Sequence, residues 1–518
     1  MSAPTPTPPL VFPIPDQEAD VTALTAPTLW MQVLFDGNKL ARVPDAIVER
    51  FRQGDQLLVT QSGVVLHLPG AAARLASEAV GLARAAFSTL AAIDDALITD
   101  FFRQFAERLA DDTVWSRIAA ANERDVHAAK ARGRSTARLA AGERMRRDMI
   151  RGLEAWEAMP SLRGMPTTAV VHEGWSIDQV TDGLGVVGFV FEGRPNVFAD
   201  AAGIVRSGNT AVLRIGSDAL GTARAIASEA LRPALRASGL PEHAVTLLDS
   251  ADRAVGWALF ADRRLSLAVA RGSGPAVTML GEIARQAGTP VSLHGTGGAW
   301  LVADARADGE RFHAALFHSL DRKVCNTVNV VLIDQRRASD LAPLALRALR
   351  ERGEALGHGY KLHVLESART CVPAGLFQTM TTIERSDRFA AEPIAESLRV
   401  DELGREWEWD ADPEISLGLV QNLDEAVSLF NAYSPRFIAS LISESPEAHD
   451  RLFRAVDAPF VSDGFTRWVD GQYALNRPEL GLSNWQYGRL FGRGGVLSGD
   501  GVCTVRLRAR QIDPQLHR

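Results

Sequence analysis

The sequence has few of the residues that mark several common classes of protein. It holds three cysteines among 518 residues, and an odd number at wide spacing supports neither a disulfide framework nor a zinc knuckle. A reducing cytosol is the compartment that this cysteine usage favours. Only four of the 56 basic residues are lysines, so Schiff-base chemistry has few candidates, and the arginines keep their charge at any working pH.

Long apolar runs and excess positive charge are also missing. No run of about 18 apolar residues occurs, which is what a membrane-spanning helix needs. Residues 1–20 are rich in proline and acidic, a pattern that resembles neither a signal peptide nor a membrane anchor and predicts a flexible tail. A net charge of −7 provides no field to attract nucleic acid or an anionic membrane. With 46% hydrophobic and 23% charged residues, the composition is that of a compact globular protein.

What is present is an alternation of apolar runs and amphipathic segments. Residues 21–70 alternate apolar and polar positions around turn signals, which predicts a small β-rich module. Helical spacing follows up to about residue 158, and residues 167–183 resemble a pair of strands. Apolar runs with helix-like stretches between them then occupy 185–191, 210–215, 244–249, 265–270, 299–303 and 328–333, and the pattern returns after residue 414. We therefore predict an α/β fold with two doubly wound lobes.

Cys325 is the best candidate nucleophile in the chain. It precedes the apolar run 328–333, and Arg322 and Lys323 stand beside it. Nearby positive charge favours a thiolate, so a lowered pKa is predicted. The alternative is a buried and inert thiol, the usual state of this residue type, and that is our interpretation of Cys371 and Cys503.

Glycine-rich turns follow several predicted strands, and each has two interpretations. Arg214 ends a strand and Ser217 and Asp218 open a helix, where they would either meet a ligand or form a plain N-cap beside a solvated arginine. Residues 271–275 and 294–298 would offer backbone N–H groups to a ligand, or serve as ordinary turns. No G-x-G-x-x-G fingerprint is present. Spacing alone thus gives a large α/β protein with one candidate thiol.

Five motifs in order resemble those of the γ-glutamyl phosphate reductase (glutamate-5-semialdehyde dehydrogenase) family, a branch of the aldehyde dehydrogenase superfamily. The similarity runs from roughly Leu75 to Arg510. The motifs are GVVGFVFEGRPNVFADAAGIVRSGNTAVLRIGSDA (185–219), VARGSG (269–274), LHGTGG (293–298), KVCN (323–326) and TRWVDGQYALNRPELGL (466–482). The resemblance implies an aldehyde-dehydrogenase-like fold with an oligomerisation strand pair, and hence a homo-oligomer.

The resemblance also implies roles for single residues. Cys325 would attack an acyl phosphate to give a thioester, which NADPH would reduce to the aldehyde. Asn326, Asn196 and the backbone N–H of Cys325 would stabilise the oxyanion. Cofactor contacts are implied for Arg214, Ser217, Asp218, Arg271, Gly272 and Gly274, and substrate contacts for Arg194, Phe437 and Arg467. Arg214 favours NADPH because its guanidinium would pair with a 2′-phosphate, whereas Asp218 weighs against it. No metal site is expected.

The implied domains follow the motifs. A dinucleotide-binding domain covers 71–290 and includes the oligomerisation strands 167–183. A catalytic domain with Cys325 covers 291–470, and a return segment with further oligomerisation strands covers 471–518. The module before residue 75 has no counterpart in the family.

Two segments depart from the family pattern. SPRFIA (434–439) replaces GSGHSE, and DGQYALNR (470–477) replaces DGGEFGLG. The loss of polar groups at Phe437, Ile438 and Ala439 predicts a bulkier or less charged acyl group. Arg436 and Arg477 would either bind an anion at a new place or lie solvated on the surface. The turn 294–298 holds no glutamate, the residue that activates water in hydrolytic aldehyde dehydrogenases.

Two other functions stay open. The first is the same chemistry with an acyl thioester on coenzyme A or a carrier protein, for which residues 21–70 would be the docking module. An upstream kinase is a further possible partner of an acyl phosphate reductase. The second is a non-catalytic paralogue that keeps the fold, against which the intact Cys325 argues.

Overall fold

The computed structural model describes residues 24–134, 136, 139–385, 388–469, 475–476, 479–485 and 496–517. The predicted tail 1–20 and Arg477 lie outside the described residues. The chain divides into two compact units, Met1–Ala71 and Ala72–Arg518. Each is described by itself.

The first unit consists of two antiparallel hairpins and a short helix. Its strands pair as β1 with β2 and as β3 with β4. The elements are β1 (Gln32–Phe35), β2 (Lys39–Arg42), α1 (Asp45–Arg50), β3 (Gln56–Val59) and β4 (Val65–Leu68). Ala41, Val43, Ile47 and Val65 form a small buried core. The short strands expected within residues 21–70 are therefore present.

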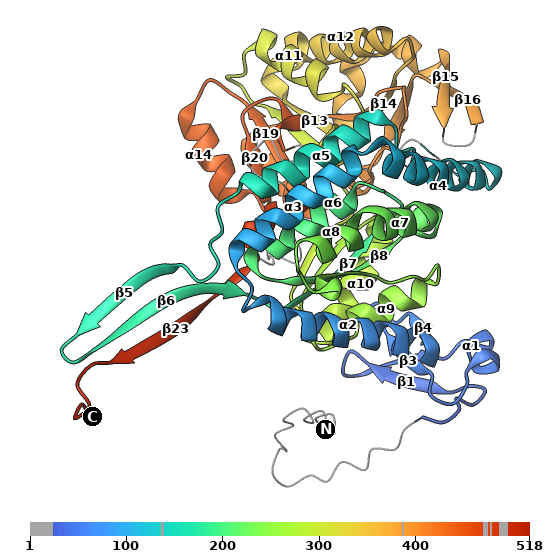
Figure 1. Cartoon of the computed structure of the whole chain (residues 1–518). Coiled ribbons are helices and arrows are strands. Elements are labelled where there is room, and N and C mark those ends of the chain that lie inside the picture. Colours follow the sequence, from blue (N-terminus) through green and yellow to red (C-terminus); the bar gives the residue numbers. More distant parts are fainter. Residues whose placement is uncertain are drawn as a thin grey trace. The chain divides into compact units, whose positions relative to one another are not determined.

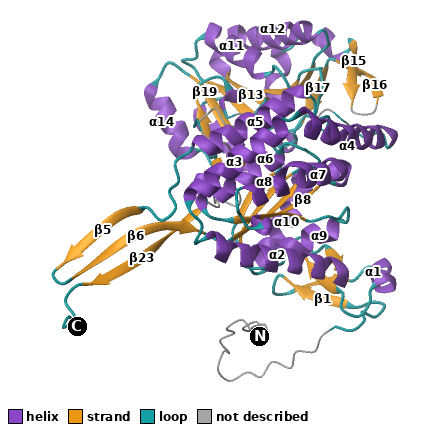
Figure 2. Cartoon of the chain, in the orientation of Figure 1, coloured by secondary structure: helices purple, strands orange, loops and turns teal. Residues whose placement is uncertain are grey.

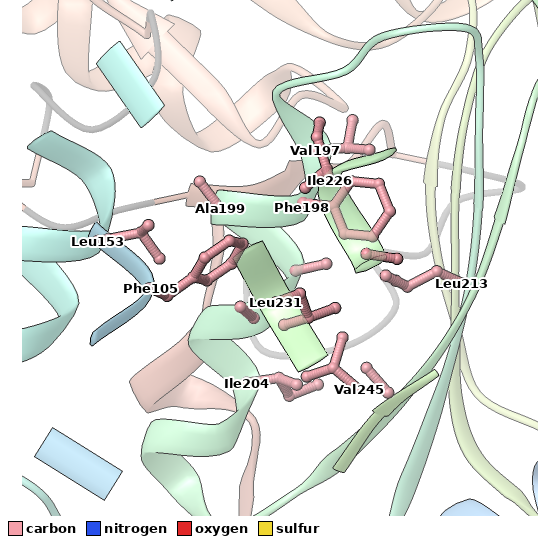
Figure 3. Close-up of a cluster of buried hydrophobic side chains, with 14 of the residues drawn as sticks. Phe105, Leu153, Val197, Phe198, Ala199, Ile204, Leu213, Ile226, Leu231 and Val245 are labelled. Carbon is pink, nitrogen blue, oxygen red and sulfur yellow. The ribbon is translucent and has the colours of Figure 1, made fainter. Parts of the chain in front are cut away.

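Four long helices open the second unit: α2 (Gly70–Leu90), α3 (Asp95–Ala110), α4 (Asp112–Ala131) and α5 (Glu143–Ala158). Asp94 and Asp111 cap α3 and α4, because their carboxylates accept hydrogen bonds from backbone N–H groups of the first turn. Phe105 of α3 and Leu153 of α5 reach the same buried cluster as Phe198, Leu213 and Leu231 (Figure 3). Helices α3 and α5 therefore share one hydrophobic core with residues of the first parallel sheet.

That sheet has five parallel strands in the order β11-β10-β7-β8-β9. They are β7 (Val186–Phe191), β8 (Thr210–Ile215), β9 (Val245–Leu247), β10 (Leu265–Arg271) and β11 (Val291–His294), joined through α6 (Val197–Ala202), α7 (Leu220–Ile226), α8 (Arg232–Ala237), α9 (Arg253–Phe260) and α10 (Gly274–Gln286). The chain order reverses between β7 and β10. Such a reversal opens a crevice for ligands at the carboxyl ends of the strands.

The second sheet has seven parallel strands in the order β17-β14-β18-β13-β12-β19-β20. Figure 2 shows strands of this sheet, among them β13 and β19, in orange among the helices. They are β12 (Ala299–Ala303), β13 (Val328–Asp334), β14 (Lys361–Leu365), β17 (Ala395–Leu398), β18 (Glu414–Val420), β19 (Ile438–Ile442) and β20 (Phe460–Ser462). Its helices are α11 (Gly309–Ser319), α12 (Ala338–Leu356), α13 (Leu423–Tyr433) and α14 (Pro446–Ala455), and β15 (Met380–Arg385) pairs with β16 (Arg388–Pro393). The prediction of two doubly wound lobes is confirmed.

A third, antiparallel sheet joins distant parts of the second unit. β6 (Trp175–Gly183) lies between β5 (Pro166–His172) and β23 (Cys503–Gln511). Figure 1 shows these three strands projecting from the helices and parallel sheets of that unit. A short pair, β21 (Glu479–Leu482) with β22 (Val496–Ser498), lies near the end of the chain. The strands predicted at 167–183 and late in the chain are present, and their role in oligomerisation remains a prediction.

Candidate active site

A cavity of about 610 Å³ lies where the carboxyl ends of β7, β10 and β11 meet the segment that contains Cys325. Helices α5 and α6 contribute further side chains to its wall. Many of the lining residues are charged: Arg144, Asp148, Glu192, Arg194, Asp200, Arg271, Arg322, Glu406, Glu408 and Glu479. Such a lining suits a polar, charged ligand better than an apolar one.

Cys325 lies in a turn between α11 and β13 that its neighbours hold in place. The hydroxyl of Thr327 accepts a hydrogen bond from Val324 N at 2.9 Å and donates one to Arg322 O at 2.7 Å. Gly298 N donates to Cys325 O at 2.7 Å. The backbone that carries the thiol is therefore fixed from within its own turn and from the glycine-rich turn 294–298.

Gly297 shows why that second turn needs glycine. A Cβ at this position would lie 2.6 Å from the Cα of Cys325, closer than real Cβ contacts allow. The backbone of the turn therefore packs directly on the cysteine, which no larger residue would permit.

The prediction of a lowered pKa for Cys325 is wrong. Burial is the largest cause that raises the pKa of the thiol to about 11, and the negative charges of Glu479 and Glu406 act in the same direction. Arg194 and Lys323 oppose this increase, but Lys323 forms an ion pair with Glu406 at 2.5 Å. The resting thiol is thus protonated at neutral pH.

Asn326 differs from its predicted role because its side chain has other partners. Its Nδ2 donates to Val469 O, and its Oδ1 accepts from Arg467 Nε at 2.8 Å. Arg467 also pairs with Asp321. Both Asn326 and Arg467 are buried and lie outside the lining of the cavity. The pair therefore stabilises the turn that carries Cys325, and neither side chain lines the cavity.

The other predicted residues fall into two groups. Asn196, Arg194, Arg271, Gly272 and Gly274 line the same cavity as Cys325. Phe437 does not, because it is completely buried and packs against Phe460 and the ring of His294.

The predicted adenosine-binding residues also have a different arrangement. Arg214 is buried, so the pKa of its guanidinium is lowered, and its Nη2 donates to Ala251 O at 3.2 Å. Ser217 is exposed. Asp218 forms ion pairs with Arg132 at 2.8 Å and with Arg134 at 2.6 Å. The cations next to Asp218 therefore come from the end of α4 and not from β8.

Six carboxylates line the cavity, and none of them was predicted from the sequence: Asp148, Glu192, Asp200, Glu406, Glu408 and Glu479. Burial raises the pKa of Asp200 to about 6, against the lowering effect of Arg271 and Arg194. Arg271 lies 3.5 Å from Asp200 and 3.7 Å from Glu479. Asp200 stands four residues after Asn196, which was a usable signal, because one helical turn places both on one face.

A dinucleotide fits the crevice of the five-stranded sheet. A Cβ on Gly216, after β8, would lie 2.8 Å from Gly193 N, after β7, so two glycine turns meet there in close backbone contact. Such turns at the ends of parallel strands give phosphates access to backbone N–H groups. Among the described residues, no helix is long and apolar enough to cross a membrane, and no cluster of side chains suits a metal ion.

A parallel dinucleotide-type sheet that shares a cavity with a cysteine from a second parallel sheet defines an oxidoreductase with the aldehyde dehydrogenase fold. No family model matches the chain. It is, however, 30% identical over 393 residues to the γ-glutamyl phosphate reductase of Gluconobacter oxydans, across 73% of this chain and 82% of that protein. The corresponding protein of Rhodospirillum rubrum is 29% identical over 396 residues, across 73% of this chain and 82% of that protein. The chain belongs to the γ-glutamyl phosphate reductase family, whose members are oxidoreductases acting on aldehyde groups.

Solved structures support the fold. The structure of γ-glutamyl phosphate reductase from Thermotoga maritima matches with a TM-score of 0.72 at 24% identity, across 86% of this chain and all (100%) of that chain. An acetylating aldehyde dehydrogenase from Geobacillus thermoglucosidasius matches with a TM-score of 0.56 at 12% identity, across 86% of this chain and 99% of that chain. The expected aldehyde-dehydrogenase-like fold is confirmed.

Proposed function

We propose that the protein reduces an acyl phosphate to an aldehyde through a thioester on Cys325, with NADPH as the cofactor. The observation that carries the proposal is the shared cavity, in which Cys325 lies with Asn196, Arg194 and the turns that end β7 and β10. Membership of the γ-glutamyl phosphate reductase family supports the same chemistry.

The chain's own residues have distinct tasks in this reaction. The sulfur of Cys325 attacks the acyl carbon, the bond from that carbon to the phosphate oxygen breaks, and inorganic phosphate leaves. The thiol proton passes to a lining carboxylate, because a thiol with a raised pKa does not ionise before the attack. The amide of Asn196, which makes no capping hydrogen bond on α6, donates to the oxyanion. Arg194 and Arg322 neutralise the phosphate.

The cofactor would lie along the carboxyl ends of the five-stranded sheet. When bound, NADPH supplies the hydride that converts the thioester to the aldehyde and regenerates the thiol. Arg271, Gly272 and Gly274 would surround the nicotinamide, and Ser217 and Asp218 would face the adenosine ribose. Arg132 and Arg134, which pair with Asp218, would contact a 2′-phosphate in place of Arg214.

The charged lining favours a charged acyl group, which differs from the expectation of a less charged one. That expectation depended on residues 437–439, but all three are completely buried and outside the lining. Arg436 donates to Asn431 O at 2.6 Å, so its guanidinium is engaged in its own loop. A γ-glutamyl group, with an ammonium and a carboxylate, suits a wall that carries both signs of charge.

The test is to follow NADPH formation with glutamate semialdehyde, inorganic phosphate and NADP. We expect turnover on the order of 10 per second, typical of biosynthetic enzymes, that requires phosphate. Turnover that requires coenzyme A or a carrier protein instead of phosphate would show that the substrate is an acyl thioester. Residues 21–70 would then be the docking module. No turnover with any acceptor would favour the non-catalytic paralogue.

A further inference from the structure

The loop 405–408, which precedes β18, is tied to the seven-stranded sheet. Asn329 of β13 accepts a hydrogen bond from Trp407 N at 2.9 Å through Oδ1 and donates to Arg405 O at 2.8 Å through Nδ2. Asn329 is buried. One side chain therefore fixes two backbone groups of the loop.

Trp407 attaches the same loop to the strands β14 and β18. Its indole is 4% exposed and stacks on His363, with ring centroids 3.5 Å apart and planes at 7°. Its Nε1 donates to Ser416 Oγ at 2.8 Å, and the guanidinium of Arg405 lies 4.5 Å from the ring centroid. A buried tryptophan with its N–H satisfied attaches the loop to the sheet.

This attachment places the carboxylate of Glu406 between the two segments that lie next to Cys325. Its Oε2 accepts from Gly297 N at 2.6 Å, and its Oε1 accepts from Lys323 Nζ at 2.5 Å. Lys323 stands two residues before Cys325, and the Gly297 backbone packs on the Cα of Cys325. The side chains of Lys323 and Glu406 are only 5% and 15% exposed. One carboxylate thus joins the two segments that enclose the thiol.

We propose that Glu406 is a positioning residue for Cys325, which holds the cysteine turn against the turn 294–298 and balances the charge of Lys323. The inference deepens the proposed function, since it takes Cys325 as the nucleophile. The charged groups that act on the thiol are Glu479, Glu406, Arg194 and Lys323. Removing one member of the Glu406–Lys323 pair would leave the charge of the other uncompensated, so the two single variants should move the ionisation of the thiol in opposite directions.

The test measures alkylation of the peptide that carries Cys325 by iodoacetamide, quantified by mass spectrometry from pH 7 upward. At a fixed alkaline pH we expect Glu406→Gln to react roughly threefold to tenfold faster than the wild type, and Lys323→Met slower by a similar factor. Glu310→Gln, an exposed carboxylate on α11, is the control and should react as the wild type does. Circular dichroism would verify that each variant is folded.

A second measurement separates the effect of the hydrogen bond between Glu406 and Gly297 N from the effect of the charge of Glu406. Glu406→Gln keeps an acceptor for Gly297 N, whereas Glu406→Ala removes it, so kcat should fall further in the alanine variant while KM for NADP stays the same. Equal changes of the alkylation rate in Glu406→Gln and Lys323→Met, or none, would overturn the proposal. Alkylation does not require turnover, so failure of the proposed function alone would leave this result intact.

Discussion

The two parallel sheets bring functional groups to the cavity by different means. The five-stranded sheet offers backbone turns, where Gly193 meets Gly216 after β7 and β8. The seven-stranded sheet offers side chains fixed by buried partners, as Asn329 and Trp407 fix the loop that carries Glu406. The proposed cofactor site thus depends on backbone turns that pack together, whereas the proposed nucleophile depends on side-chain contacts between segments far apart in the sequence.

The strongest test of this comparison is Cys325→Ala. Turnover should fall on the order of 10⁴-fold or more, because no other group can form the thioester. NADPH binding, followed by fluorescence titration, should be unchanged, since the five-stranded sheet supplies most of that site. Cys371→Ala is the matched control and should keep full turnover. An equal loss of turnover and of NADPH affinity would show that the two sheets do not act separately.

The pH dependence of the thiol is the next test. With a pKa of about 11, the protonated form dominates below that pH, and the thiolate fraction rises about tenfold per pH unit. Alkylation of Cys325 in the free enzyme should therefore rise roughly 10³-fold between pH 7 and pH 10. A plateau reached by pH 8 would mean that the seven-stranded sheet lowers the pKa, as the sequence alone suggested.

The contacts of Arg467 with Asn326 and Asp321, next to Cys325, should contribute to the free energy of unfolding. Arg467→Met would leave Asn326 and Asp321 without their shared partner. Because Asp321 is half exposed, we expect a loss of about 2 kcal/mol in the free energy of unfolding, measured with urea. Arg347→Gln, which removes an exposed pair with Glu351, should cost less than about 0.5 kcal/mol. Equal losses in the two variants would contradict the structural role of Arg467.

A smaller effect is expected at the five-stranded sheet. Replacing Arg132 and Arg134 by alanine should weaken NADPH binding about tenfold, because charged hydrogen bonds to a phosphate contribute roughly 1.5 kcal/mol. NADH binding should not change. Arg117→Ala, on helix α4 and paired with Glu229, is the control. Tighter binding of NADH than of NADPH by the wild type would remove the preference for NADPH.

The smallest effect is expected at the antiparallel sheet, where two substitutions should lower the oligomer's mass in solution. Val171 of β5 and Leu507 of β23 are 77% and 67% exposed, and exposed apolar edges of this kind need a cover. We expect a homo-oligomer by light scattering, reduced in mass by Val171→Asp combined with Leu507→Asp. Val64→Asp in the first unit is the control. A monomeric wild type at micromolar concentration would contradict the prediction.

Much of the scaffold could be predicted from the sequence. The apolar runs at 185–191, 210–215 and 328–333 became β7, β8 and β13, because a strand buried on both faces needs apolar residues at each position. The turn at Arg271 and Gly272 was also predicted, because it follows an apolar run, and the family resemblance implied its cofactor role; both residues line the cavity.

The side-chain network could not be predicted. Arg322 and Lys323 suggested a lowered pKa for Cys325, but Glu406 lies 83 residues from Lys323 in the chain and pairs with it. Phe437 stands in a motif that departs from the family, yet it packs into the core. The residues next to a position show neither how deeply it is buried nor which distant segments contact it. Burial and distant contacts decide both the pKa of Cys325 and the placement of Phe437.

The central claim is a covalent thioester on Cys325, and one experiment tests it most directly. The enzyme is mixed with glutamate semialdehyde and NADP without phosphate, and NADPH formation and intact protein mass are recorded together. We expect a burst of one NADPH per subunit, an acyl group on the peptide that contains Cys325, and continued turnover once phosphate is added. Steady NADPH formation without phosphate, or an acyl group on any other residue, would contradict it.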